Sequence, residues 1–214
     1  MPAEKGYIAD IRKDYQLATL NESVTGDDPL VFFKKWFDEA VTAQAEEVNA
    51  MTLATVRDGK PHARIVLLKG LDEQGFVFFT NYSSNKGKDL ASNAYVAAVF
   101  FWKELERQIR IEGSVRKISE ADSDAYFYSR PANSQIGAWA SPQSMRIDSR
   151  NVLDDNYAYY LQKFGTNIPR PPHWGGYVII PETIEFWQGR SSRMHDRILF
   201  TFANGQWEKS RLAP

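Results

Sequence analysis

The sequence predicts a mainly antiparallel β protein of the α+β class, a barrel with packed helices. Two observations predict this fold. Short apolar segments of strand-like composition follow one another at hairpin distance, and the pairs Asp58-Gly59 and Asn204-Gly205 are strong hairpin turn signals. The helical patterns are segregated between groups of these hairpin-linked strands, an order typical of antiparallel barrels with packed helices.

The first helix is predicted from its capping residues. Asp28 is a preferred N-cap, Pro29 suits the first helical position, and apolar residues then recur three and four positions apart as far as Gln44. Further helices are expected over 86–93, from 119 onward through 127, and over 149–164, where Gly165 is a suitable C-terminal stop. Strands are expected over 51–56, 63–69, 76–80, 95–102, 106–118, 176–181, 183–188 and 197–203, with a closing strand after the second hairpin turn.

The chain of 214 residues is long enough to bury a full hydrophobic core. We expect one domain over 27–214, preceded by a polar arm over 1–26 that lacks clear periodicity and is predicted to be mobile. No apolar run reaches the roughly 18 residues of a membrane span, and the first residues lack the apolar region of a signal peptide. The sequence therefore predicts a cytoplasmic protein without a membrane partner.

Composition excludes several kinds of site. The formal net charge of −1 argues against a nucleic-acid partner, because such surfaces normally show a basic excess. The absence of cysteine excludes disulfides, thiolate catalysis and iron–sulfur or zinc–cysteine sites. His62, His173 and His195 are too few and too scattered for a recognisable metal site, so we expect none.

An apolar strand bracketed by two cations, Arg64 and Lys69, is the first candidate for ligand binding. Strict alternation places these two side chains on opposite faces of the strand. If both serve a ligand, the site lies at a sheet end or is shared between subunits. The alternative is a buried strand whose charged ends reach solvent.

The polar segment 80–88, Thr-Asn-Tyr-Ser-Ser-Asn-Lys-Gly-Lys, runs into a predicted helix N-terminus. Backbone N–H groups, hydroxyls and a lysine at such a place make a natural phosphate cradle, although the segment matches no Walker pattern. Taken alone, a solvated surface loop is the alternative. The strand face that carries Gln108, Arg110 and Glu112 also has two interpretations. It is a solvated surface, or it is functional if it closes over a pocket.

Tyr126 and Arg130 are four residues apart, so on a helix they share a face. Together with the hydroxyl of Ser134, the phenol and the guanidinium could hold one phosphate dianion. The alternative from spacing alone is a helix end with an exposed arginine.

The segment 187–197 carries three arginines and His195 within eight residues, beside Trp187. Alternation predicts that Arg193, His195 and Arg197 share one face of an extended strand. Such clustered cations are hard to explain as core, and a ligand site is the better interpretation.

Read together, these segments resemble the pyridoxamine 5′-phosphate oxidase family. The resemblance rests on RIVLLK (64–69), TN-x-x-S-x-K (80–86), LERQ (105–108), SRP-x-x-SQIGAW (129–139), FWQG…R-x-HDR (186–197) and the terminal RLAP (211–214). It implies an FMN-binding split β-barrel with packed helices, and a homodimer with FMN bound in clefts at the subunit interface.

The same resemblance implies roles for individual residues. The FMN contacts would be Arg64, Ile65, Val66, Leu67, Leu68, Lys69, Phe79, Thr80, Asn85, Lys86, Gln108, Gln143, Ser144, Trp187 and Arg197. The substrate phosphate would meet Lys69, Tyr126, Arg130 and Ser134, while Arg193 and His195 would lie over the pyridine ring as catalytic residues. Arg12, Lys13, Asp14 and Tyr15 resemble the family's mobile cover over the substrate. One departure is Asn85, which stands where relatives commonly carry arginine.

The implied activity is FMN-dependent oxidation of pyridoxamine 5′-phosphate and pyridoxine 5′-phosphate to pyridoxal 5′-phosphate. A hydride passes from substrate C4′ to flavin N5, O2 is the electron acceptor and H2O2 the product. Two alternatives are a related flavoprotein oxidase of phenazine-type aromatics and a non-catalytic flavin or pyridoxal-phosphate binder. The intact SRP-x-x-S motif disfavours the first, and the retained Arg193 and His195 disfavour the second.

Overall fold

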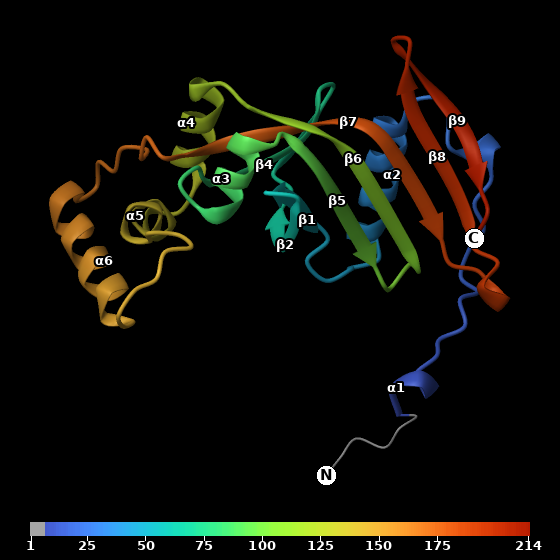
Figure 1. Cartoon of the computed structure of the whole chain (residues 1–214), viewed down its shortest axis with the longest axis horizontal. Coiled ribbons are helices and arrows are strands. Elements are labelled where there is room, and N and C mark those ends of the chain that lie inside the picture. The colour runs from blue at the N-terminus through green and yellow to red at the C-terminus, as the bar shows by residue number, and fades with distance from the viewer. Residues whose placement is uncertain (1–6) are drawn as a thin grey trace. The chain divides into compact units, whose positions relative to one another are not determined.

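A computed structural model describes residues 7–214, which form an antiparallel sheet with surrounding helices (Figure 1). The strands are β1 (Ala50–Arg57), β2 (Lys60–Leu67), β3 (Gly70–Asp72), β4 (Gly75–Asn81), β5 (Tyr95–Trp102), β6 (Arg107–Lys117), β7 (Trp174–Gln188), β8 (Asp196–Ala203) and β9 (Gln206–Leu212). The helices are α1 (Tyr7–Asp10), α2 (Pro29–Thr42), α3 (Asn85–Ser92), α4 (Glu120–Ser129), α5 (Ala132–Ala140) and α6 (Asn151–Phe164), with 3₁₀ turns η1 (Glu22–Val24) and η2 (Ser191–Arg193). This arrangement confirms the predicted class.

The strand order is β2-β1-β5-β6-β7-β4-β3, and β8 pairs with both β7 and β9. The described chain divides into two compact units, which we call the first and second units. The first contains the described residues up to Val48, then Val99–Ile111 and Thr183–Pro214, and the second contains Asn49–Ala98 and Glu112–Glu182. A single domain over 27–214 stays a prediction. Residues 1–6 of the predicted arm lie outside the described residues.

In the first unit, helix α2 supplies the core against the sheet (Figure 1). Asp28 caps it as predicted, because its side chain accepts from the backbone N–H groups of Leu30 and Val31. The ring of Phe32 lies 4.7 Å from that of Phe186 on β7, and the ring of Phe33 lies 5.2 Å from that of Phe100 on β5. Burying each of these rings contributes roughly 1.5–3 kcal/mol, which fixes the helix on the sheet.

In the second unit, β1 and β2 form the hairpin predicted at Asp58-Gly59, with Arg57 opposite Lys60. Both turn residues have positive φ, 53° and 72°, as a two-residue turn of this kind requires. Strand β4 pairs with the first part of β7, and Phe79 lies opposite Gly176. This pairing holds the end of β4 and the following loop in place.

Besides α1 and the two 3₁₀ turns, which were not predicted, three elements differ from the sequence predictions. One strand, β7, replaces the two expected on either side of Pro181, because Pro181 lies between the segment paired with β4, which ends at Ile179, and the segment paired with β8, which starts at Thr183. Helix α5 was not predicted, since it begins after Pro131 without a side-chain cap. The short strand β3 was also missed.

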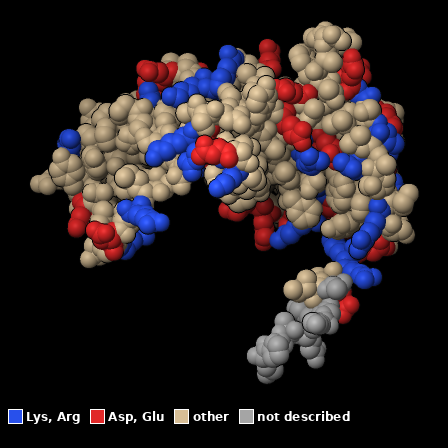
Figure 2. Space-filling model, viewed as in Figure 1, with Lys and Arg blue, Asp and Glu red and all other residues tan. Residues whose placement is uncertain are grey.

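Charged side chains of both signs are interspersed over the face shown in Figure 2, in keeping with the net charge of −1. Within residues 7–214, no helix is long and apolar enough to cross a membrane.

Candidate active site

A cavity of about 450 Å³ lies within the second unit, between β2, β4, α3, α4 and α5. The predicted site residues that line it are Ile65, Val66, Leu67, Lys69, Phe79, Thr80, Lys86, Tyr126, Arg130, Ser134 and Gln143. Segments far apart in the sequence therefore contribute to one cavity. Four predicted flavin contacts of this unit lie outside that lining: Leu68 is buried, Arg64 is half-buried, and Asn85 and Ser144 are exposed.

Lys86 occupies the first turn of α3, where the phosphate cradle was predicted. Ser84 caps this helix by accepting from the N–H of Gly87, and a side chain at Gly87 would collide with the carbonyl oxygen of Tyr82. Lys86 Nζ lies 3.2 Å from Thr80 Oγ1 and 3.4 Å from Gln143 Oε1. Burial, and then the charge of Arg64, lower the pKa of Lys86, so its ammonium group would be stabilised by an anion.

Arg64 is held by the protein from three sides. Its Nη1 donates to Thr55 Oγ1 at 2.7 Å and to the carbonyl oxygen of Leu53 at 3.2 Å, and its Nη2 lies 3.4 Å from Asp89 Oδ2. Asp89 is fully buried and also contacts His62 Nδ1 at 3.1 Å. These contacts fix the guanidinium before any ligand arrives.

Asp89 was not among the residues predicted from the sequence. Burial alone would raise its pKa, but hydrogen bonds from Thr55 and His62 and the charge of Arg57 lower it overall. A signal was present, since alternation places His62 and Arg64 on one face of β2, and an arginine beside a histidine on one strand face calls for an acidic partner.

Arg130 has an unsatisfied donor. It follows the last residue of α4, its guanidinium lies 4.6 Å above the ring of Trp174, and its buried Nη1 donates no hydrogen bond to any residue that the structure describes. Burial lowers its pKa, an effect that Tyr126 partly offsets. Because a buried donor without an acceptor is costly, this geometry favours an anion in the cavity. Tyr126 is oriented by stacking on Phe79, with ring centroids 3.9 Å apart.

A second cavity, of about 560 Å³, lies within the first unit. The N-terminal segment and the loop between β7 and β8 form it, and it contains the predicted residues Arg12, Lys13, Asp14, Tyr15, Arg193 and His195, together with Arg190. The ring of Tyr15 packs edge-on against Trp187, with centroids 5.7 Å apart. The structure thus gathers the predicted cover and the two predicted catalytic residues at one place.

The loop corrects one sequence prediction. Arg193 belongs to the 3₁₀ turn η2 and His195 follows it outside any strand, so the two do not share a strand face with Arg197. Arg197 lies on β8 and binds Glu185 through two nitrogens, at 2.7 and 3.0 Å. Burial, and then the charge of Arg193, lower the pKa of His195. The remaining predicted flavin contact, Gln108, is half-buried on β6 in this unit.

Comparison with known sequences decides the family. A family model described as "Pyridoxamine 5′-phosphate oxidase" matches residues 37–164, and one described as "Pyridoxine 5′-phosphate oxidase C-terminal dimerisation region" matches residues 174–214. The chain belongs to the pyridoxamine 5′-phosphate oxidase family. It is therefore an oxidoreductase, and the second match supports a dimer.

Relatives in this family match almost the whole chain. Pyridoxine/pyridoxamine 5′-phosphate oxidase of Cupriavidus necator is 56% identical over 209 residues, 97% of this chain and 99% of the relative. The enzyme of the same name from a Nostoc species is 58% identical over 210 residues, 97% of this chain and 98% of the relative.

Solved structures share the fold of this pyridoxamine 5′-phosphate oxidase family chain. PhzG from Burkholderia lata, in complex with tetrahydrophenazine-1-carboxylic acid, has a TM-score of 0.87 and 28% identity, covering 93% of this chain and all of that one. A pyridoxamine 5′-phosphate oxidase-related, FMN-binding protein from Nostoc punctiforme has a TM-score of 0.68, but its 17% identity shows the fold alone. The matches confirm the predicted split-barrel class and the family resemblance.

Proposed function

We propose that this chain is an FMN-dependent oxidase that converts pyridoxamine 5′-phosphate and pyridoxine 5′-phosphate to pyridoxal 5′-phosphate, with O2 as acceptor and H2O2 as product. The observation that carries the proposal is the unsatisfied, buried Nη1 of Arg130 in a cavity that also contains Lys69, Tyr126 and Ser134. Relatives 56% and 58% identical carry the corresponding name.

The cavity of the second unit suits a phosphorylated substrate. A phosphate dianion provides acceptors for the Arg130 guanidinium, the Lys69 ammonium group and the hydroxyls of Tyr126 and Ser134. The guanidinium of Arg130 packs on the ring of Trp174, so its N–H donors are oriented before the phosphate binds. These residues bind the phosphate end of the substrate. The pyridine ring is then free to turn its reacting carbon away from them.

The residues also fit FMN. Lys86, whose ammonium group is desolvated, and Arg64, whose guanidinium is fixed by Thr55 and Asp89, supply two cations for the flavin phosphate, and Thr80 and Gln143 supply polar groups beside Lys86. When bound, FMN would supply the acceptor for a hydride from substrate C4′ and the route by which its electrons reach O2.

Arg193 and His195 orient the substrate and stabilise charge in this proposal. His195, whose pKa is lowered by burial and then by the charge of Arg193, serves here as a hydrogen-bond donor and not as an obligatory base. Arg193 is exposed on its turn and is free to reach a ligand. Tyr15 and Arg12 cover the substrate from the N-terminal segment.

Two copies of the chain complete the site. The family's C-terminal dimerisation region covers residues 174–214, which include Trp187, Arg193, His195 and Arg197. We place FMN at the interface, where one protomer contributes the phosphate-binding cavity and its partner contributes the loop with Arg193 and His195. Strand β2 ends at Leu67, so Lys69 lies beyond it, and Arg64 and Lys69 do not lie on opposite faces of one strand as predicted.

An anaerobic half-reaction tests the activity. Protein loaded with FMN is mixed with pyridoxamine 5′-phosphate, the visible absorption of the flavin is followed, and O2 is then admitted. The expected result is bleaching, followed by recovery and the appearance of pyridoxal 5′-phosphate. A flavin that stays oxidised while demonstrably bound rejects this substrate, and the same assay with tetrahydrophenazine-1-carboxylic acid then tests the phenazine alternative.

A further inference from the structure

The loop between β7 and β8, residues 189–195, has a conformation that its sequence does not favour. Ser192 and Arg193 both have positive φ, 55° and 61°, a region that side-chain-bearing residues seldom adopt. Such a conformation persists only where surrounding contacts hold it. The contacts that hold this loop therefore decide where Arg193 and His195 lie.

Arg190 makes two of these contacts. Its Nη1 donates to Asp196 Oδ2 at 2.8 Å, so the ion pair joins the two ends of the loop. Its backbone N–H donates to His195 Nδ1 at 3.1 Å. A backbone N–H can only donate, so Nδ1 is the nitrogen with the lone pair and the ring proton of the neutral imidazole is on Nε2.

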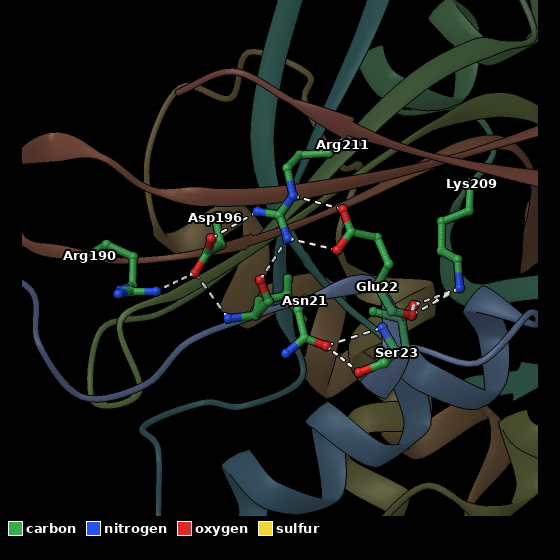
Figure 3. Close-up of polar contacts among 9 residues, drawn as sticks. Asn21, Glu22, Ser23, Arg190, Asp196, Lys209 and Arg211 are labelled. Carbon is green, nitrogen blue, oxygen red and sulfur yellow. Dashed lines mark hydrogen bonds and ion pairs between the residues drawn. The ribbon is translucent and has the colours of Figure 1, made fainter.

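Asp196 is itself firmly anchored (Figure 3). Its Oδ2 accepts from the N–H of Leu20 at 3.0 Å, and its Oδ1 accepts from Arg211 Nη1 at 2.9 Å. Arg211 in turn binds both carboxylate oxygens of Glu22, at 2.7 and 2.9 Å. The carboxylate that receives Arg190 is thus tied to the N-terminal segment and to β9.

We propose that Arg190 is a positioning residue: its ion pair with Asp196 holds its own N–H against His195 Nδ1 and so presents Nε2–H to the substrate as a fixed donor. The proposal rests on the proposed function for the role of His195, but not for its tautomer. Position 190 lies in the unspecified part of the FWQG…R-x-HDR motif, so the motif alone does not assign it.

Among residues 7–214, the other groups around His195 make ring contacts with it and do not supply this hydrogen bond. Trp187 packs on its ring with centroids 4.6 Å apart, and Tyr15 lies 6.0 Å away at a tilt. The charged groups at the same cavity are Arg12, Lys13, Asp14, Arg190 and Arg193. The ring packing restricts the plane of the imidazole, whereas the Arg190 N–H selects which nitrogen keeps the proton.

Arg190→Ala and Asp196→Asn separate positioning from charge. Both variants break the ion pair, but the first removes a positive charge beside His195 and the second removes a negative one. A purely electrostatic effect would move the ring-nitrogen NMR shifts of His195 in opposite directions in the two variants. Loss of positioning would instead change the tautomer of His195 in the same direction in both. Arg190→Lys keeps the charge and is expected to restore part of the effect, and Arg150→Ala, which breaks the exposed Arg150–Asp154 pair, is the control.

The readout is the set of ring-nitrogen NMR shifts of protein labelled in histidine. The chain has three histidines, so His195→Asn assigns the signals of His195 directly. We expect one tautomer, protonated at Nε2, in the wild type and in Arg150→Ala. We expect mixed tautomers in both ion-pair variants, and in each a kcat/KM for pyridoxamine 5′-phosphate lowered about tenfold, the effect of roughly 1.4 kcal/mol.

The tautomer is measured without substrate, so it decides the proposal even if turnover fails. The proposal is overturned by an Nε2–H signature of His195 that survives in Arg190→Ala. It is also overturned by ring-nitrogen NMR shifts of His195 that change in opposite directions in Arg190→Ala and Asp196→Asn. Arg190 is partly exposed, so Arg190→Ala is expected to fold even if Asp196→Asn does not. A wild type that shows the expected tautomer but no flavin reduction rejects the proposed function and leaves the positioning of His195 standing.

Discussion

Arg64 forms an ion pair with the buried Asp89 in the second unit, with Arg64 Nη2 3.4 Å from Asp89 Oδ2 and Thr55 Oγ1 hydrogen-bonded to both. The side chain of Asp89 is fully buried, and Arg57 and His62 also contact it. The carboxylate therefore holds in place the arginine that we assign to the flavin phosphate. Two predictions concern this pair.

Asp89→Asn is expected to lower the free energy of unfolding by about 2 kcal/mol. Removing one partner of a fully buried pair costs roughly 3–5 kcal/mol, and the loss is smaller here because Arg57, His62 and Arg64 are partly exposed. Urea unfolding at neutral pH measures it. Asp38→Asn, which breaks the exposed Lys34–Asp38 pair, is the control, and a loss as small as in that variant would contradict the prediction.

The stabilisation by Asp89 is expected to depend on pH in a defined direction. Its pKa is lower in the folded protein, so its contribution is fully present above the unfolded value of about 3.9 and is lost as the pH falls through the folded value. The difference in unfolding free energy between wild type and Asp89→Asn should thus be largest above about pH 5 and shrink below about pH 4. A difference that grows on acidification would refute this sign.

Arg130→Met is expected to separate stability from binding. Without ligand, the free energy of unfolding should change by less than about 1 kcal/mol, because a desolvated guanidinium with an unsatisfied Nη1 is replaced by an apolar side chain of similar length. The KM for pyridoxamine 5′-phosphate should rise about 100-fold, since a hydrogen bond to a charged group contributes roughly 1.5–3 kcal/mol.

Inorganic phosphate gives a second readout for Arg130. It should raise the thermal unfolding temperature of the wild type and of Arg116→Met, but not that of Arg130→Met. Arg116 is exposed on β6 in the same unit and contacts Gln74, so its replacement tests for an unspecific loss of positive charge. Equal stabilisation of all three proteins would remove Arg130 from the phosphate site.

Lys86→Met is expected to weaken FMN binding by about 30-fold, because the charge-assisted contact to the flavin phosphate is lost. Quenching of flavin fluorescence on titration of apoprotein measures the affinity. Lys88→Met, two positions along α3 and exposed, should leave it within about twofold. If both variants bind FMN alike, the ammonium group of Lys86 does not contact the phosphate.

Much of the fold was predictable because its signals are local. Asp28 caps α2 through hydrogen bonds to N–H groups two and three residues ahead, and Asp58-Gly59 adopts the positive φ angles of its hairpin turn. The segments that line the cavity of the second unit were predictable as well, because the residue types at 64–69, 80–86 and 129–134 carry charge and hydroxyls at spacings that suit a dianion. Each such signal spans less than ten residues.

The sequence by itself determined the antiparallel class, the family motifs and the identity of many of the residues that line both cavities. Only the tertiary structure decided that Asp89 fixes Arg64, that Arg193 lies on a 3₁₀ turn, and that Arg190 selects the tautomer of His195. The physical reason is that hydrogen bonds and ion pairs act over about 3 Å between groups that folding alone brings together. Asp89 is 25 residues from Arg64, and no local pattern records that distance.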